Sequence, residues 1–177
     1  MSQESFITAE IRALVGKEEV FSSPEEIGRA TIRRFARVVG DSNPLYLDEA
    51  YARRTKYGGI ISPPTMIFEL NHNLSGDVSE EDGGYTDKVT LPPPLTRFIR
   101  GGNEYEIFQP ARPDDRITVQ RKICDIFEKK GKAGILVFVI VEFKYFNQKA
   151  ELLGINRETL VFMPEQNRPA GEKGDGK

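Results

Sequence analysis

The sequence predicts an α+β fold in a single domain, with helices in the first half of the chain and an antiparallel sheet in the second. Up to about Gly76, apolar residues recur at helical spacing behind helix-start signals. After Gly102 they alternate, or run together as β-branched stretches between short polar turns. A chain of 177 residues can bury one substantial core. We therefore expect one domain over residues 1–163, followed by a disordered polar tail over residues 164–177.

The first predicted helix runs from about Pro24 to Val39. Ser23 is placed to cap it, Pro24 suits the first helical position, and Glu26 can bond back to the cap. Gly40 supplies a left-handed stop. The stripe that this helix would bury consists of Ile27, Ile32, Phe35, Val38 and Val39.

A second helix is predicted to begin after Ser62, as its cap, and to end before Gly76. We expect this helix to form the centre of the fold, with Met66, Ile67, Leu70 and Leu74 on its apolar face. The segment from Gly76 to Leu95 is acidic and contains three consecutive prolines, which a helix or a central strand does not accept. It is predicted to be a long surface loop.

Three strands are predicted in the second half of the chain. The first covers Ile117 to Ile123 and leads to a turn at residues 129–132. The second contains the continuous apolar run Ile135–Val141, which indicates a strand buried on both faces. After a polar turn at residues 147–149, the third covers Leu152–Phe162. Short turns between long strands predict an antiparallel meander.

Composition excludes several classes of function. With 25 basic and 27 acidic residues the net charge is −2, so no general attraction to nucleic acid or an anionic membrane is expected. The longest apolar run is too short to span a bilayer. The first ten residues do not resemble a signal peptide, and the single cysteine, Cys124, cannot form an internal disulfide. These features predict a cytoplasmic protein that requires no metal and no cofactor.

The most informative segment is Asp41-Ser42-Asn43-Pro44-Leu45-Tyr46-Leu47-Asp48. Asp-x-Asn-Pro alone is also a common turn. Together with residues 58–65 (GGIISPPT) and 110–116 (PARPDDR), however, this segment resembles the MaoC-like (R)-specific enoyl-CoA hydratases and 3-hydroxyacyl dehydratases. The second stretch is similar to the N-terminal, FAS1-like dehydratase branch, whose members often form the non-catalytic half of a pair. The resemblance implies a hotdog fold, in which an antiparallel sheet wraps around a central helix.

The same resemblance implies a degenerate catalytic dyad. Asp41 matches the family's catalytic aspartate, but Tyr46 stands where the family has its histidine. A phenol, with a pKa near 10, is a poor base at neutral pH. Pro64 aligns with the glycine whose N–H binds the thioester carbonyl in active relatives, and proline has no N–H. The N–H of Thr65 could substitute, unless the Ser62 cap occupies it.

The resemblance further implies that the ligand is an acyl thioester of coenzyme A or of a carrier protein. Asn43, Pro64 and Thr65 are then expected beside the substrate. Arg53, Arg54 and Lys56 are candidates for its phosphates, although such charges also suit a solvated helix face. His72, the only histidine, is interpreted as a solvated or interface residue rather than a catalyst.

Three functions remain open at this point. The first is a non-catalytic acyl-binding subunit that pairs with an intact MaoC-like hydratase chain. The second is a self-sufficient homodimeric hydratase or dehydratase that uses Asp41 and Tyr46. The third is a non-enzymatic acyl-CoA sensor or scaffold. For either kind of dimer, the strand predicted over residues 102–109 is expected to form the edge shared between subunits.

Overall fold

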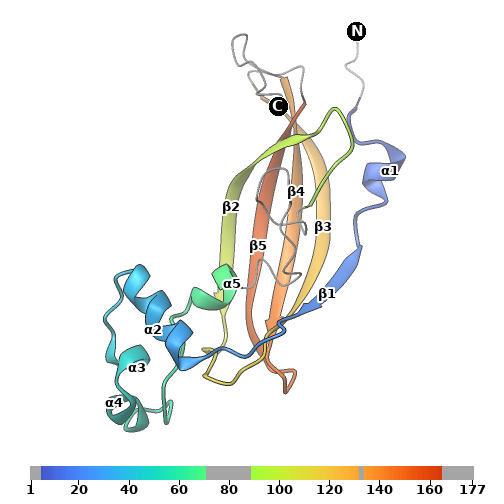
Figure 1. The fold of residues 1–177 in the computed structure, drawn as a ribbon. Helices are drawn as coiled ribbons and strands as arrows, with labels where there is room; N and C mark the ends of the chain where they lie inside the picture. Colours follow the sequence, from blue (N-terminus) through green and yellow to red (C-terminus); the bar gives the residue numbers. More distant parts are fainter. Residues whose placement is uncertain (1–4, 71–88, 132–133, 165–177) are drawn as a thin grey trace.

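Five antiparallel strands form one sheet, in the order β1-β3-β4-β5-β2. The computed structural model describes residues 5–70, 89–131 and 134–164 (Figure 1). The α+β class and the hotdog fold are confirmed. The strands are β1 Glu18–Ser22, β2 Arg97–Ile107, β3 Thr118–Gly131, β4 Gly134–Phe146 and β5 Leu152–Met163.

Short helices accompany the sheet. Figure 1 shows α2, α3 and α4 gathered beside one end of the sheet, with α5 between them and the strands. The helix α5 supplies the first residues of the predicted central helix, and the remainder of that prediction, including Leu74 and His72, lies outside the described residues. The helices are α1 Ala9–Arg12, α2 Arg29–Val38, α3 Pro44–Leu47, α4 Glu49–Arg53 and α5 Met66–Leu70.

The predicted meander of β3, β4 and β5 is confirmed, but the prediction that β4 is buried on both faces is wrong. Val137, Val139 and Val141 are fully buried, whereas the residues between them are only half-buried. On that second face Phe138 stacks on Phe127, with ring centroids 5.2 Å apart. Among the described residues, the apolar clusters cover only the face that carries the three valines, which we call the inner face.

The first predicted helix begins later than expected. Helix α2 starts at Arg29 with Gly28 as its N-cap, so the capping box at Ser23 does not form. The hydroxyl of Ser23 instead donates to the carbonyl of Glu25 at 2.7 Å. The reason is a long-range contact: Ile27 N–H donates to the Asp115 carbonyl at 2.8 Å, and Asp114 N–H donates to the Ile27 carbonyl at 2.9 Å. These bonds hold the segment extended.

The predicted surface loop is also corrected where the structure describes it. Leu91 and Leu95 are buried in the same apolar cluster as β4 and β5. Sequence reasoning weighed the prolines and acidic residues and overlooked these two leucines at the end of the segment. The rest of the predicted loop (residues 76–88) and the predicted tail beyond Pro164 lie outside the described residues.

Helix α5 packs against the inner face at a glycine. Phe68 is fully buried, and its ring stacks on Tyr105 at 4.6 Å and meets Tyr145 edge-on at 5.0 Å. A Cβ atom at Gly154 of β5 would lie 2.9 Å from Phe68 Cζ and 3.0 Å from the Glu106 carbonyl oxygen. The absence of a side chain at this position therefore lets the helix approach the sheet.

We expect Gly154→Ala to lower the free energy of unfolding by about 1–3 kcal/mol, because the ring and a backbone carbonyl would both have to move. Urea-induced unfolding measures this loss. Gly102→Ala in the neighbouring strand is the matched control, since a Cβ atom there meets nothing within 4 Å. An equal loss in both variants would show that the close packing under Phe68 is not the cause.

Candidate active site

The carboxylate of Asp41 is held at the end of α2 by local hydrogen bonds. Gly40 adopts φ 72°, which ends the helix. Asp41 N–H donates to the Ala36 carbonyl at 2.8 Å, and Asp41 Oδ1 accepts from Asn43 N–H at 3.0 Å. The side chain is half-buried. One carboxylate oxygen is thus used by the turn itself, which is the Asx geometry that the motif predicts.

The rest of the motif forms two short helices rather than a loop. Asn43 is the N-cap of α3: its side-chain oxygen accepts from Leu45 N–H at 3.0 Å, and Pro44 occupies the first turn. Asp48 caps α4 in the same way, by accepting from Tyr51 N–H at 3.0 Å. These polar residues of the motif therefore have structural partners.

Asn43→Ala is expected to lower the free energy of unfolding by about 1 kcal/mol, because the cap of α3 is lost. Asn43→Ser should retain most of the stability, since a serine hydroxyl can accept the same bond. Thermal unfolding of the two variants distinguishes a capping role from a role in ligand binding alone, which would leave both as stable as the unsubstituted chain.

Tyr46 faces the core. It is only 6% exposed and belongs to the apolar cluster that contains Phe68 and Tyr145. Burial raises the pKa of its phenol above the ordinary value, and the neighbouring Asp41 carboxylate and Tyr57 raise it further. The phenol is thus kept neutral at physiological pH, and the chain offers no basic nitrogen at the position of the family histidine.

The segment that leads into α5 differs from the prediction. Ser62 does not cap the helix: its N–H donates to the Ala111 carbonyl at 2.8 Å, which draws it against the 110–116 segment. Its hydroxyl is buried and has no hydrogen-bond partner among the residues that the structure describes. The N–H of Thr65 is therefore not occupied by Ser62. Both Pro64 and Thr65 are exposed, in a turn that precedes Met66.

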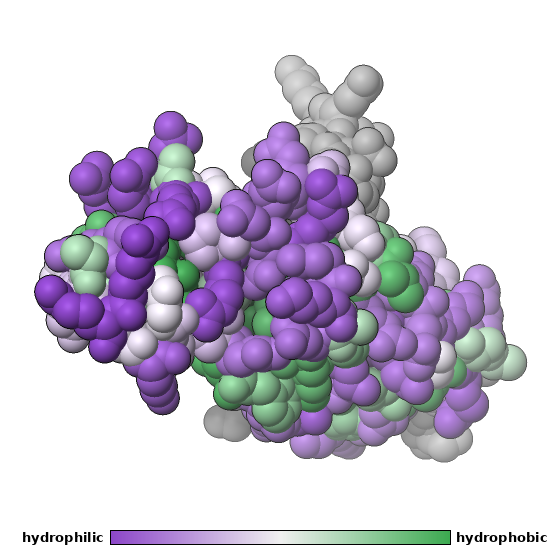
Figure 2. Space-filling model, turned by 90° about the horizontal axis from the view of Figure 1, so that it is seen from below, coloured by the Kyte–Doolittle hydropathy of each residue, from purple (hydrophilic) through white to green (hydrophobic). Residues whose placement is uncertain are grey.

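The predicted phosphate contacts lie on the surface of the helical lobe α2–α4, which is mostly hydrophilic (Figure 2). Arg53 Nε pairs with Glu49 Oε1 at 2.8 Å, and Arg29 pairs with the other oxygen of Glu49. Lys56 Nζ lies 5.1 Å from the centre of the Tyr57 ring, and Arg54 is exposed. The structure thus pairs Arg53 with a carboxylate.

A small cavity of about 110 Å³ reaches Tyr46 from this lobe. Sequence reasoning did not single out Glu49, which lines the cavity and whose pKa is lowered first by Arg53 and then by Arg29. The four-residue spacing of Glu49 and Arg53 could have indicated their pairing. The other lining residues are Arg29, Arg33, Leu47 and Ile60.

Two further features of the described residues bear on function. Within residues 5–70, 89–131 and 134–164, no three His, Cys, Asp or Glu side chains are arranged to hold a metal ion. None of the helices in these ranges is long and apolar enough to cross a bilayer.

A single sheet with a short helix buried on its inner face defines the hotdog fold, and Tyr46 of the Asp-x-Asn-Pro motif shares a buried cluster with that helix. The family model described as "FAS1-like, dehydratase domain region" matches residues 13–154. The chain belongs to this FAS1-like dehydratase family.

Other proteins are similar to this chain in sequence or in fold. A UPF0336 protein of Streptomyces coelicolor is 33% identical over 120 residues, which are 68% of this chain and 75% of the relative. A probable enoyl-CoA hydratase alpha subunit of Thermomonospora curvata is 28% identical over 149 residues, and the match covers 80% of this chain but only 47% of that relative. One chain in the crystal structure of the ChsH1-ChsH2 complex from Mycobacterium tuberculosis superposes with a TM-score of 0.68 at 18% identity, and the match covers 93% of this chain and 95% of that chain.

Proposed function

We propose that this chain is an acyl-thioester-binding subunit of an (R)-specific enoyl-CoA hydratase or 3-hydroxyacyl dehydratase, and that a partner chain with an intact MaoC-like motif performs the proton transfer. The observation that carries the proposal is the buried, neutral phenol of Tyr46 at the position of the family's base. The ligand is an acyl thioester of coenzyme A or of a carrier protein.

Hydration of an enoyl thioester needs a base that takes a proton from water and an acid that protonates the α-carbon. An ordinary phenol must lose about three pKa units, or roughly 4 kcal/mol, before it acts as a base at neutral pH. In this chain both burial and Asp41 shift the pKa of Tyr46 in the opposite direction. Asp41 therefore has no partner in the described residues that could complete the dyad.

The enolate oxygen also needs a hydrogen-bond donor. Pro64 cannot donate where active relatives use a glycine N–H. Because Ser62 does not occupy the N–H of Thr65, that amide is the remaining candidate beside Pro64. The loss of activity is thus assigned mainly to Tyr46, with Pro64 as a second defect.

The acyl chain is expected to lie against the apolar residues of α5. Met66, Ile67 and Phe68 are all buried, and they share one cluster with Tyr46. The protein subunit would thus provide a complementary apolar surface for the acyl group of the ligand. The thioester would then lie near Asp41, at the rim of the same cluster.

The free edge of β2 is the surface that fits the partner chain. β2 is 11 residues long, lies at the end of the sheet, and is exposed along nearly all of its length. An uncovered edge that carries apolar side chains is a ready site for another strand. The hydratase alpha subunit cited above is about twice the length of the matched region, and the superposed structure is a complex, which favours a second hotdog unit as the occupant. The exposed apolar residues along and just beyond this edge are Ile99, Tyr105, Ile107 and Phe108.

Co-expression with a MaoC-like chain that carries the intact aspartate and histidine tests the proposal. We expect the two chains to copurify and the complex to hydrate enoyl-CoA, while this chain alone binds acyl-CoA in calorimetry without turnover. Acyl-CoA binding with no hydratase partner would favour a sensor or scaffold instead. Turnover by this chain alone would favour the self-sufficient enzyme.

A further inference from the structure

The inner face of the sheet carries a buried polar pair between its two apolar clusters. Asn156 and Glu158 lie two residues apart on β5 and are 0% and 5% exposed. In the strand register Asn156 stands opposite Phe143 of β4 and Tyr105 of β2. Phe143 packs against both clusters, so Asn156 lies where they meet.

Asn156 has no hydrogen-bond partner for either polar atom of its side chain, within the part of the chain that the structure describes. Glu158 Oε1 forms an ion pair with Arg100 Nε at 2.5 Å, although no well-directed hydrogen bond reaches this oxygen. Arg100 is more than half exposed, so the cationic partner of the buried Glu158 lies at the protein surface. The amide of Asn156 is thus a buried group whose hydrogen bonds are not made among the described residues.

Such an amide is costly to a fold. A buried donor or acceptor without a partner destabilises a protein by more than the loss of an ordinary hydrogen bond, and an apolar residue of similar shape would remove the cost. Leucine has the same branching and the same number of side-chain heavy atoms as asparagine. Retention of an amide in an otherwise apolar region therefore points to a group from outside the chain that satisfies it.

The position of Asn156 connects it to the proposed acyl site. Tyr105, opposite Asn156, stacks on Phe68, whose ring lies over Gly154 two residues away on the same face. Phe68 in turn belongs to the cluster of Tyr46. A ligand that extends from the motif along Phe68 would therefore reach the amide of Asn156.

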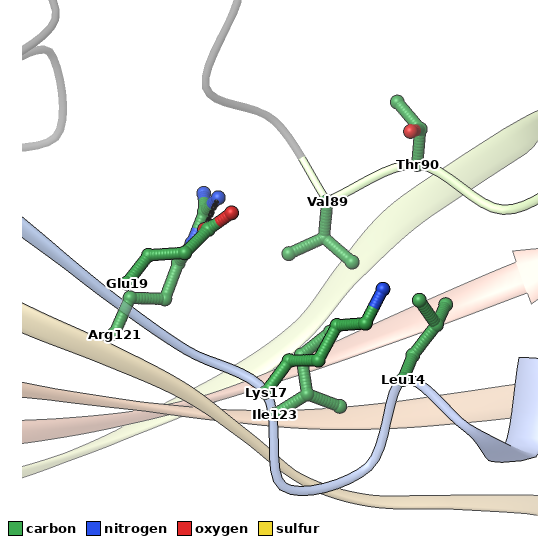
Figure 3. Close-up of a pocket in the computed structure, with 7 residues that line it drawn as sticks. All are labelled: Leu14, Lys17, Glu19, Val89, Thr90, Arg121 and Ile123. Atoms are coloured by element: carbon green, nitrogen blue, oxygen red, sulfur yellow. Dashed lines mark hydrogen bonds and ion pairs between the residues drawn. The ribbon is translucent and has the colours of Figure 1, made fainter.

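The residues that stand opposite one another across the strands from Asn156 lead to a cavity. Phe143 is opposite Arg121 of β3, and Arg121 is opposite Glu19 of β1. Arg121 and Glu19 line a cavity of about 170 Å³ whose remaining wall is formed by Leu14, Lys17, Val89, Thr90 and Ile123 (Figure 3). Two strand spacings, roughly 10 Å, separate Arg121 from Asn156. The cross-strand row from Asn156 through Phe143 to Arg121 and Glu19 thus ends at this cavity.

From this arrangement we infer that Asn156 recognises an oxygen substituent on the bound acyl chain, a hydroxyl or keto group beyond the reactive carbons. The amide offers two donors and one acceptor, which a hydroxyl group matches in both senses and a keto group matches as an acceptor. Glu158 adds an acceptor beside it. This inference rests on the proposed function, since it concerns the selectivity of the same acyl site.

Calorimetry with the purified chain tests the inference. The ligands are a saturated acyl-CoA and the positional isomers of its derivatives that carry one hydroxyl or keto group beyond the third carbon. We expect the unsubstituted chain to bind at least one oxygenated isomer about tenfold more tightly than the plain thioester. Asn156→Leu should abolish this preference and unfold at the same or a higher temperature.

Ile155→Leu is the matched control, because Ile155 is a buried neighbour on the other face of β5, and it should leave the preference intact. A preference that persists in Asn156→Leu overturns the inference. If that variant does not fold, the unsubstituted chain decides alone: equal or weaker binding of every oxygenated isomer contradicts the inference. Neither of these outcomes contradicts the proposed function. Failure of the unsubstituted chain to bind any acyl-CoA would contradict both the inference and the proposed function.

Discussion

In the reconstituted complex, alanine at the motif histidine of the partner chain is expected to reduce hydration by about a thousandfold, whereas Asp41→Asn in this chain should change it by no more than about twofold. The partner's histidine would be the only base at neutral pH, because Tyr46 is buried and its pKa is raised. Steady-state hydration of an enoyl-CoA by the two singly substituted complexes measures the contrast.

Asparagine is a suitable probe at position 41 because its side-chain oxygen can still accept from Asn43 N–H, as Asp41 Oδ1 does. A change in fold is therefore not expected to confuse the result, and thermal unfolding checks this. A loss of a hundredfold or more in Asp41→Asn would show that this carboxylate carries protons, and the assignment of a silent subunit would be wrong.

The second large effect concerns the edge of the sheet. Ile99 and Phe108 are 53% and 55% exposed, one within β2 and the other just beyond its last residue. Replacing both by lysine should weaken the complex at least a hundredfold, because an edge strand that carries charged side chains resists pairing with another strand. Analytical ultracentrifugation of mixtures with the partner chain measures the dissociation constant.

Val20→Lys is the matched control for this substitution. Val20 is 65% exposed, and it lies on β1, the strand at the opposite edge of the sheet. The control should leave the complex intact. Dissociation by Val20→Lys but not by the β2 substitutions would place the partner on the other edge.

Much of the sheet could be predicted from sequence because its signals are local. The apolar run in β4, the polar turn at Asn147 and the alternation in β3 each indicate a strand or a turn without reference to the rest of the chain. The burial of β4 could not be predicted, because it depends on which face receives a covering layer. A run of branched residues looks the same whether the second face is buried or half-exposed.

The helix predictions failed where a distant segment competes with a local signal. Ser23-Pro24-Glu25-Glu26 has the residues of a capping box, but hydrogen bonds from Ile27 to the turn at Asp114–Asp115 hold that segment extended. Ser62 likewise bonds through its backbone to Ala111. Neither contact has a signature in the local sequence, since the bonded residues are separated by tens of positions along the chain.

The candidate site also combines features that the local sequence predicts with features that it does not. The turn at Asp41 and the cap at Asn43 follow from the residue types and their spacing, and the structure contains both. The pairing of Arg53 with Glu49 was missed, although the spacing permits it. Asn156 could not have been identified from sequence, because an asparagine in a strand is unusual only once its burial and the absence of a partner among the described residues are known.

The most direct measurement is the rate at which this chain hydrates an enoyl-CoA when purified without any other hotdog chain, compared with its Tyr46→Phe variant. We predict no turnover above the uncatalysed rate for either protein, together with acyl-CoA binding by both. Hydration at a rate typical of an enzyme, abolished by Tyr46→Phe, would contradict the account, because the phenol would then be taking part in the reaction.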